Sequence, residues 1–314
     1  MPGAELRDRW GVLLLAHGAP DRLDDIPEFL LHVRNGRPLP APVVEEIKHR
    51  YALIGGGSPL LTHSRRQAEL LAARLGRPVY LAMRNWHPFI AEVVPDILKD
   101  SIECLVVLCL APHNSRTSVG LYSQRLEEAL AQAGTSLTVR FIESWHDNPQ
   151  LIQAFAEKLR AALAEATAAA GVPVPVILTA HSVPERTIAT GDSYDAQVKE
   201  TIAQVAEAAG CELWQGAYQS QGMTSEPWLG PTVESIIDQL AAAGHRHVLL
   251  APIGFLCDHV EVLYDVDIAF RNYARGKSVT LWRTESLNES PLLIEGLAGI
   301  INTAIAAVRP IPRA

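Results

Sequence analysis

The chain has 314 residues, of which 48% are hydrophobic and 20% are charged. This balance is that of a folded globular protein and excludes the disordered, collagen-like and coiled-coil classes. At about 150 residues per domain, the length predicts two domains with a core each. The formal net charge of −8 predicts no nucleic-acid partner, because phosphates are held by clustered lysine and arginine.

The distribution of apolar residues predicts a cytoplasmic protein without a transmembrane segment. Even the alanine-rich stretch 161–178 is broken by charged, glycine and proline residues, so no run reaches the length of a membrane span. Glu5 and Asp8 precede the first apolar run, which is unlike the basic start of a secretory signal. The four cysteines form no CxxC pair and are predicted to be buried thiols.

Taken in chain order, eight short runs rich in Val, Leu and Ile alternate with longer amphipathic stretches. The runs predicted to be strands are 11–16, 79–83, 104–110, 137–142, 174–180, 212–218, 247–252 and 278–282. The stretches predicted to be helices are 24–34, 42–53, 64–75, 88–99, 118–133, 149–170, 193–209, 231–243, 258–273 and 291–307. This alternation predicts an α/β fold with parallel sheets.

An internal repeat decides between one eight-stranded barrel and two smaller sheets. LLAHGAPDR at 14–22 and LTAHSVPER at 178–186 share Leu, Ala, His, Pro and Arg, and each begins in an apolar run. The repeat favours two similar doubly wound, Rossmann-like parallel-sheet domains over the barrel. We predict a first domain of residues 1–145 plus 288–314, to which the last helix returns, and a second domain of residues 146–287.

Histidines follow two of the predicted strands at matching places in the repeat. His17 comes directly after the first strand, and His181 follows the fifth. Ligands bind open parallel sheets beyond the carboxyl ends of their strands. We therefore expect both imidazoles to line a cleft between the two domains, where they can ligate a metal or accept a proton.

A third group of chemical interest is the acidic run from Asp258 through Glu261 to Asp265. The spacing of i, i+3 and i+7 predicts three carboxylates on one helical face, where their repulsion would be relieved by a bound cation or a shared proton. The alternative is that Asp258 caps the helix while the other two face water. The sequence leaves both interpretations open.

Two irregular segments have the composition of binding loops. The stretch 218–231 contains amides, hydroxyls and a tryptophan, among them Ser220 and Trp228. The stretches 34–40 and 50–59 combine Arg34, Arg50 and Ser58 with a glycine turn, a mixture that suits carboxylates or phosphates. Neither GxGxxG nor GxxxxGK[ST] occurs, so no nucleotide motif is present.

Read together, these segments closely resemble the ferrochelatase family, enzymes that insert ferrous iron into a porphyrin. The resemblance extends from about residue 13 to about 297. Its most specific motifs are AHSVPE at 180–185, YQSQG at 218–222 with PWLGP at 227–231, and PIGFLCDHVEVLYD at 252–265. RY with GGGSP in 50–59, MRNWHP at 83–88 and LAPH at 110–113 support it.

The resemblance implies a lyase of haem biosynthesis, a metal chelatase that takes a porphyrin and Fe²⁺ as substrates and needs no cofactor. It implies that His181 and Glu261 are catalytic and bind the metal, with His181 facing the macrocycle and Glu261 opposite it, and that Asp265 relays protons or the hydrated cation. The expected substrate-binding residues are His17, Arg34, Arg50, Ser58, Ser220 and Trp228. A transient haem-acceptor protein is a further expected partner.

The chain also departs from the family pattern. Ala269 stands where a third carboxylate often continues the acidic helix, and His17 stands where many coproporphyrin-using members have tyrosine. Asn85 stands where related bacterial enzymes have histidine. No cysteine follows Cys257, so the C-terminal cysteines that hold an iron–sulfur cluster in animal-type members are absent and no such cluster is expected.

The identity of the substrate is the least determined part of this interpretation. The polar stretch 34–42 at the expected entrance favours coproporphyrin III over protoporphyrin IX, because coproporphyrin carries four carboxylates and protoporphyrin two. Two alternatives stay open: a carrier that binds porphyrin or haem without catalysis, and a cobalt or nickel chelatase of the same fold. Imidazole and carboxylate accept several divalent ions, so the residues do not separate the metals.

Overall fold

All the strands that the structure describes lie parallel to their neighbours. The computed structural model describes residues 9–135, 137–222 and 226–307, in which the strands form two four-stranded sheets. The strands are β1 (Trp10–Ala16), β2 (Val79–Met83), β3 (Cys104–Cys109), β4 (Thr138–Ile142), β5 (Val176–His181), β6 (Trp214–Gln219), β7 (His247–Ala251) and β8 (Thr280–Arg283). The orders are β2-β1-β3-β4 and β6-β5-β7-β8. The same order in each half confirms two similar parallel-sheet domains and excludes the barrel.

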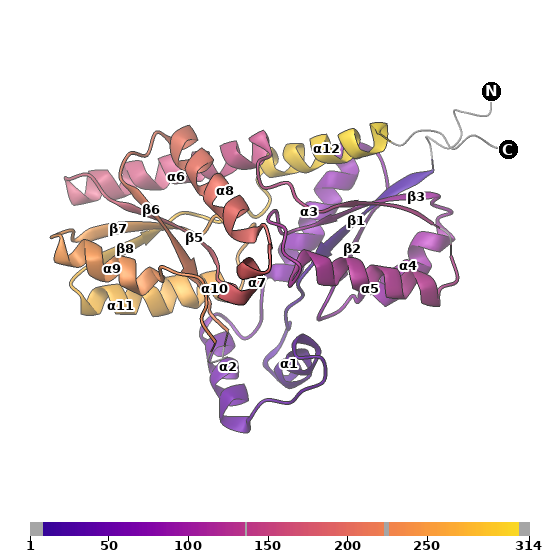
Figure 1. Ribbon diagram of the computed structural model, residues 1–314, viewed down its shortest axis with the longest axis horizontal. Helices are drawn as coiled ribbons and strands as arrows, with labels where there is room; N and C mark the ends of the chain where they lie inside the picture. The colour runs from indigo at the N-terminus through magenta and orange to yellow at the C-terminus, as the bar shows by residue number, and fades with distance from the viewer. Residues whose placement is uncertain (1–8, 136, 223–225, 308–314) are drawn as a thin grey trace.

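Helices cover both faces of the first sheet (Figure 1). Alternate residues of β1 point to opposite faces, as they must in a strand. Leu13 and Leu15 pack with residues of α4 (Ile90–Lys99) and α5 (Val119–Gln132) in one core. Leu14 packs on the other face with α3 (Leu60–Leu75) and α12 (Pro291–Ala306). Burial on both faces explains why β1 is apolar at nearly every position.

The second sheet is covered in the same way. Ile177 of β5 packs with α9 (Val233–Ala242) and α11 (Arg271–Gly276), whereas Leu178 faces α6 (Pro149–Ala170) and α8 (Tyr194–Ala209). Local sequence defines the ends of α6, since the Asn148 side chain accepts hydrogen bonds from two main-chain N–H groups at its start. At its end, Gly171 adopts the left-handed conformation, with φ of 68°.

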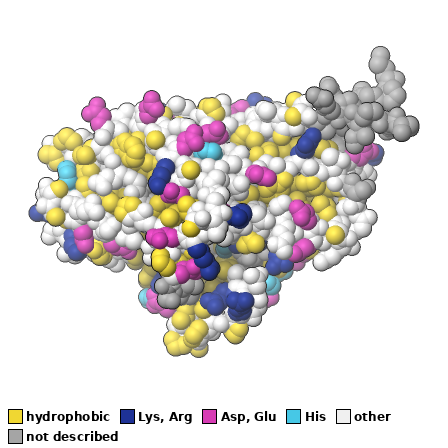
Figure 2. All heavy atoms as spheres, in the orientation of Figure 1, with side chains coloured by type: hydrophobic (Ala, Val, Ile, Leu, Met, Phe, Trp, Pro, Cys, Tyr) yellow, Lys and Arg dark blue, Asp and Glu magenta, His cyan; other side chains and the backbone are white. Residues whose placement is uncertain are grey.

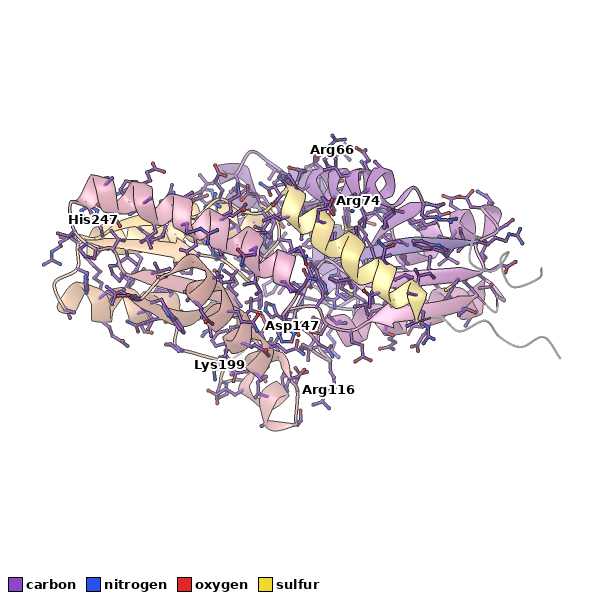
Figure 3. All side chains as sticks on the ribbon, turned by 90° about the horizontal axis from the view of Figure 1, so that it is seen from above. Arg66, Arg74, Arg116, Asp147, Lys199 and His247 are labelled. Carbon is purple, nitrogen blue, oxygen red and sulfur yellow. The ribbon has the colours of Figure 1, made fainter. Side chains whose placement is uncertain are left out.

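The two domains share a layer of helices. Seen from above, α6 lies over the second sheet and α12 over the first (Figure 3). α12 packs against α3 of the first domain and α6 of the second, and Glu295 on α12 pairs with Arg74 on α3, with 2.6 Å between Oε1 and Nε. The contact with α3 is the one expected of a returning C-terminal helix, while the boundaries at 145 and 288 stay a prediction.

A small lobe projects from the first sheet below the junction of the two domains (Figure 1). It consists of α1 (Ile26–Val33) and α2 (Ala41–Leu53), whose buried side chains pack on Trp86. Figure 2 shows hydrophobic atoms at the tip of this lobe and Lys and Arg side chains above them. The remaining short helices are a 3-10 turn (Leu23–Asp25), α7 (Glu185–Ala189) and α10 (Val260–Leu263).

The prediction of one regular helix over residues 258–273 is wrong. The chain instead forms α10, a π-helix (Asp265–Phe270) and then α11, and the Ala269 N–H donates to the Tyr264 carbonyl, five residues back. Asp258 precedes α10 and accepts hydrogen bonds from the side chains of Arg283, Ser286 and Asn288. The expected face of three carboxylates is therefore incorrect, because Asp258 is engaged in its own partly buried network.

Two further predictions concern membrane-spanning helices and the state of the cysteines. Across the described residues, no helix combines the length and the apolar character that crossing a bilayer requires. The four cysteines are buried and unlinked, as predicted from the absence of a CxxC pair.

Candidate active site

A cleft of about 680 Å³ lies where the carboxyl ends of strands from both sheets meet. Its lining includes His17 after β1, residues 110–113 after β3, His181 at the end of β5 and residues 254–257 after β7. A cleft of this volume, mostly apolar with a few polar groups, is typical of a site for an organic ligand. The prediction that both repeated histidines line an inter-domain cleft is confirmed.

The tautomer of His181 is defined by its neighbour. Its Nδ1 lies 2.5 Å from the Ser182 carbonyl oxygen, which can only accept, so Nδ1 carries the proton and donates. The Tyr194 hydroxyl donates to the His181 carbonyl at 2.8 Å and holds the main chain. Nε2 therefore presents a lone pair, and the side chain is 38% exposed. This nitrogen can accept a proton or ligate a metal ion.

Close packing of β7 against β5 brings Glu261 to this lone pair. A Cβ on Gly254 would lie 2.7 Å from the Cα of Ala180, so only glycine lets the chain after β7 pass this close to the end of β5. The Gln219 side-chain N–H₂ then donates to the Glu261 carbonyl at 2.9 Å. The main-chain carbonyl of the same Gln219 accepts from the Ser182 N–H at 2.7 Å. One buried residue thus connects the main chain next to His181 with the main chain of Glu261.

The carboxylate of Glu261 is not fully engaged. Its Oε2 is buried and has no hydrogen-bond partner among the described residues, and it lies 3.6 Å from Nε2 of His181. That separation is too long for a hydrogen bond. Two ligand atoms 3.6 Å apart can share one divalent ion at bond lengths of about 2.1 Å. A buried oxygen without a partner is costly unless an ion or proton completes it.

The same distance corrects one expectation. His181 and Glu261 are neighbours on the wall formed by the second domain, so a macrocycle cannot lie between them. The group across the cleft is His17 of the first domain. A ring bound in the cleft would therefore meet both side chains on one face, rather than one on each face.

Asp265 lies at the start of the π-helix, one turn beyond Glu261. The Ser220 hydroxyl donates to Oδ2 of Asp265 at 2.5 Å. Burial raises the pKa of Asp265 to about 6, and the negative charge of Glu261 adds to the shift while the Ser220 hydrogen bond opposes it. A carboxyl group with such a pKa exchanges a proton near neutral pH, as the predicted relay requires.

The raised pKa of Asp265 leads to a prediction about stability. Because the folded state holds this proton more tightly than the unfolded chain does, wild type loses stability as pH rises through about 6. Asp265→Asn keeps an acceptor for Ser220 and carries no charge. We expect the unfolding free energy of Asp265→Asn, taken relative to that of wild type, to be about 1 kcal/mol higher at pH 7.5 than at pH 5.

Urea denaturation of both proteins at the two pH values measures this difference. Asp267→Asn is the matched control in the same π-helix, where Asp267 pairs with Arg271 at 3.2 Å and Arg283 at 3.0 Å. It should lose stability at both pH values. An Asp265→Asn advantage that does not change with pH would contradict the assignment.

His17 differs from its counterpart in the repeat. Its Nδ1 donates to the Gly18 carbonyl at 2.9 Å, as in His181, but its Nε2 accepts from the Asn85 side-chain N–H₂ at 3.0 Å. The His17 side chain is exposed within the cleft, but the protein around it displaces bulk water, and this desolvation lowers its pKa to about 4, with a further contribution from the positive charge of Arg84. His17 is therefore a neutral imidazole whose two nitrogens are both hydrogen-bonded.

Of the other predicted substrate-binding residues, one lines the cleft and the rest lie outside its lining. Trp228 lines the cleft, whereas Ser220 lies outside its lining and donates to Asp265, which is also outside it. Arg50 lies just outside, with its guanidinium 5.2 Å from the centre of the Tyr264 ring and 3.1 Å from Glu46. Arg34 is exposed at the end of α1. Ser58 is buried, and its hydroxyl accepts from the Leu60 N–H at the start of α3.

Several polar residues of the cleft were not predicted from the sequence. They lie within helices or on loops whose neighbours are known only after folding: Tyr51, Ser64, Gln67, Arg84, His113 and Tyr194. Ser64 and Gln67 are almost fully buried, and each has one side-chain oxygen without a hydrogen-bond partner among the described residues. The one available signal was their spacing of three residues on α3, which places both on one helical face.

This chain is similar to known proteins over nearly its whole length. The ferrochelatase family model matches residues 9–305. A ferrochelatase of Acidobacterium capsulatum is 46% identical over 96% of this chain and 96% of its own. A coproporphyrin III ferrochelatase of Geobacillus kaustophilus is 36% identical over 93% of this chain and 94% of its own.

Solved structures confirm the architecture. The sirohydrochlorin chelatase SirB of Bacillus subtilis subspecies spizizenii, determined with cobalt, superimposes with a TM-score of 0.60 over 95% of this chain and 96% of its own, at 9% identity. The same fold at this identity supports the architecture alone. The family match confirms the predicted enzyme class, a metal-chelatase lyase of haem biosynthesis: the chain belongs to the ferrochelatase family.

Proposed function

We propose that this ferrochelatase inserts Fe²⁺ into coproporphyrin III, in preference to protoporphyrin IX, with His181 and Glu261 as the catalytic and metal-binding pair. The observation that carries this proposal is Oε2 of Glu261, which has no hydrogen-bond partner among the described residues and lies 3.6 Å from the Nε2 lone pair of His181. Both side chains are about one-third exposed to the cleft. Such a pair has the donor atoms for a proton and for a divalent ion.

The reaction needs both capacities. A free-base porphyrin loses two pyrrole protons, and the ferrous ion loses its water ligands as it enters the ring. Nε2 of His181 accepts a proton, and the Glu261 carboxylate compensates the charge of the incoming ion. Asp265, with its pKa of about 6, takes protons onward or holds the hydrated cation. Iron is thus a substrate, and the proposal assigns no cofactor.

The arrangement of the pair bears on the two alternative functions. A carrier has no use for a carboxylate left without a partner beside an imidazole, because the burial of that oxygen costs stability and adds nothing to ring binding. Selection among Fe²⁺, Co²⁺ and Ni²⁺ does not follow from one imidazole and one carboxylate. Iron is therefore proposed on the family assignment, and a test with all three ions decides.

Coproporphyrin III is proposed because of the charges near the cleft entrance. The α1–α2 lobe carries Arg34 and Arg50, and Figure 2 shows its basic side chains on one exposed face. Arg34 and Arg50 are the sequence neighbours of Val33 and Tyr51 in the cleft lining, and two guanidinium groups there suit a ligand with four carboxylates better than one with two. Relatives of this chain carry both the general name and the coproporphyrin name.

The proposed contact leads to a prediction for substrate choice. Arg50→Gln and Arg34→Gln should each raise KM for coproporphyrin III about fivefold, with a smaller rise for protoporphyrin IX, since an exposed Arg–carboxylate pair is worth about 1 kcal/mol. Turnover should change less, because the contact is equally present before and during insertion. Steady-state kinetics with both porphyrins at two salt concentrations measures this.

Arg66→Gln is the matched control, because Arg66 is an exposed residue of α3 that pairs with Glu69. It should leave both KM values unchanged. Equal losses for the two porphyrins in the Arg34 and Arg50 variants would contradict the proposed preference and leave the chelatase activity standing.

The direct test of the function is anaerobic incubation with Fe²⁺, Co²⁺ or Ni²⁺ and each porphyrin in turn, following loss of the free-base spectrum. We expect the highest kcat/KM for Fe²⁺ with coproporphyrin III. Porphyrin binding without insertion of any ion would favour the carrier instead. A cytoplasmic location and transfer of the product to a haem-acceptor protein complete the proposal.

A further inference from the structure

The two domains present equivalent histidines to the cleft, but the structure treats their ring nitrogens differently. In both, Nδ1 donates to the carbonyl of the next residue, Gly18 or Ser182. A neutral imidazole then has one acceptor left, which is Nε2. In His181 this nitrogen faces Oε2 of Glu261, which has no hydrogen-bond partner among the described residues. In His17 it accepts a hydrogen bond from Asn85 at 3.0 Å.

Asn85 holds His17 at more than one point. Its main-chain N–H donates to the His17 carbonyl at 3.0 Å, in addition to the side-chain bond to Nε2. The orientation of the amide is consistent, because Oδ1 of Asn85 accepts from Nε of Arg84 at 3.4 Å. Asn85 is 5% exposed. The imidazole is thus fixed at both nitrogens, and its last lone pair is directed to Asn85 instead of to the cleft.

The repeat explains how Asn85 comes so close. Gly18 has φ of +87°, and a Cβ there would lie 2.7 Å from the main-chain nitrogen of Trp86. Only glycine allows the loop after β2 to approach the end of β1 in this way. The matching residue of the second domain is Ser182. The two halves of the repeat therefore differ in sequence at this position, Gly18 against Ser182, and the difference affects His17 alone.

We propose that Asn85 is a positioning residue that prevents His17 from ligating the iron of the product. This inference rests on the proposed function, since it concerns an iron porphyrin held in the cleft. His17 and His181 come from the two walls, so both imidazoles together could bind the iron from its two faces. Such a complex must break two axial bonds before the product leaves, which lowers the dissociation rate. With Nε2 of His17 engaged by Asn85, His17 and His181 together supply one imidazole at most to the iron.

The test uses ferric coproporphyrin III added directly to the purified full-length protein, so that no insertion step is needed. Asn85→Leu keeps the number and branching of the side-chain heavy atoms but cannot donate to Nε2. We expect wild type to give a high-spin spectrum without a second imidazole. We expect Asn85→Leu to give a low-spin, bis-imidazole spectrum and release of the iron porphyrin to an excess of a haem-scavenging protein at least about tenfold slower.

Two further variants keep the test decisive. Asn85→Ala also removes the donor and introduces no larger side chain, so it replaces Asn85→Leu if that variant folds poorly. It should give the same low-spin spectrum. Asn85→Leu combined with His17→Phe should return to the high-spin spectrum, because the new ligand has been removed. A merely structural role of Asn85 would alter stability without adding an imidazole to the iron.

Three outcomes would overturn the inference. Wild type could already show two imidazoles, one of which is lost in His17→Phe. The Asn85 variants could bind iron coproporphyrin III with an unchanged spin state and release rate. Failure of wild type to bind iron coproporphyrin III at all would overturn the proposed function first, and is distinguished from the other two by the absence of any spectral change on mixing.

Discussion

Glu261→Gln is expected to slow metal insertion by about two orders of magnitude or more, the usual contribution of a positioned acid–base group. Glutamine has the shape of glutamate but no charge, so it can neither hold a proton at this position nor compensate a divalent ion. The Glu261 carbonyl still accepts from Gln219, because that bond involves the main chain. The fold and the affinity for free porphyrin should therefore be preserved.

Single preparations of wild type and variant, assayed for porphyrin binding by fluorescence and for turnover anaerobically, measure the effect. Glu200→Gln is the matched control, since Glu200 also pairs with a histidine, at 3.1 Å from Nε2 of His146. It should retain wild-type turnover. Asp265→Asn should be slower than wild type but faster than Glu261→Gln. If the two acidic variants rank the other way, the metal or proton route does not begin at Glu261.

His181→Ala is expected to remove insertion to a similar extent while porphyrin still binds. The lost group acts on the pyrrole protons and the metal, whereas the ring is held by the rest of the cleft wall. The side chain is 38% exposed, so its truncation opens no closed cavity in the core. Turnover should fall by about 10²- to 10⁴-fold with little change in unfolding free energy.

The control for this variant is His87→Ala, because His87 is an exposed histidine that also pairs with a glutamate, with 2.9 Å between its Nδ1 and Oε1 of Glu92. Circular dichroism and thermal unfolding of all three proteins establish that the fold is intact. Near wild-type turnover in His181→Ala would assign this histidine a structural role and remove it from the mechanism.

Much of the fold was predictable because the signal is local. Apolar runs such as LLLA at the end of β1 and VILTA in β5 are buried on both faces, which leaves few other structures for them. The repeated histidines mark matching strand ends, and this was enough to choose two sheets over a barrel. The same reasoning explains why His17 and His181 could be placed in the cleft before any contact was known.

The acidic segment shows where local reasoning fails. Regular helical spacing predicted Asp258 on the same face as Glu261 and Asp265. Its actual partner Arg283 is 25 residues away on β8, and the π-helix adds a residue to the turn that follows α10. Neither the distant arginine nor the wider turn has a signature in the segment itself, so pattern alone could not find them.

The hydrogen bonds of the cleft were equally beyond the sequence. Gln219 belongs to a motif that resembles the family, yet its bonds to Ser182 and Glu261 depend on how β6 lies beside β5. Asn85 was noted only as a departure from the family, whereas its contact with His17 joins residues from the ends of two neighbouring strands. Such contacts are set by the register of the sheets.

The most direct test of the account is a single-turnover experiment in which protein loaded with coproporphyrin III is mixed anaerobically with Fe²⁺. Loss of the free-base spectrum then reports insertion alone, without substrate binding or product release. We expect rapid conversion by wild type and at least about 100-fold slower conversion by Glu261→Gln loaded to the same extent. Equal single-turnover rates in the two proteins would contradict the claim that the His181–Glu261 pair inserts the metal.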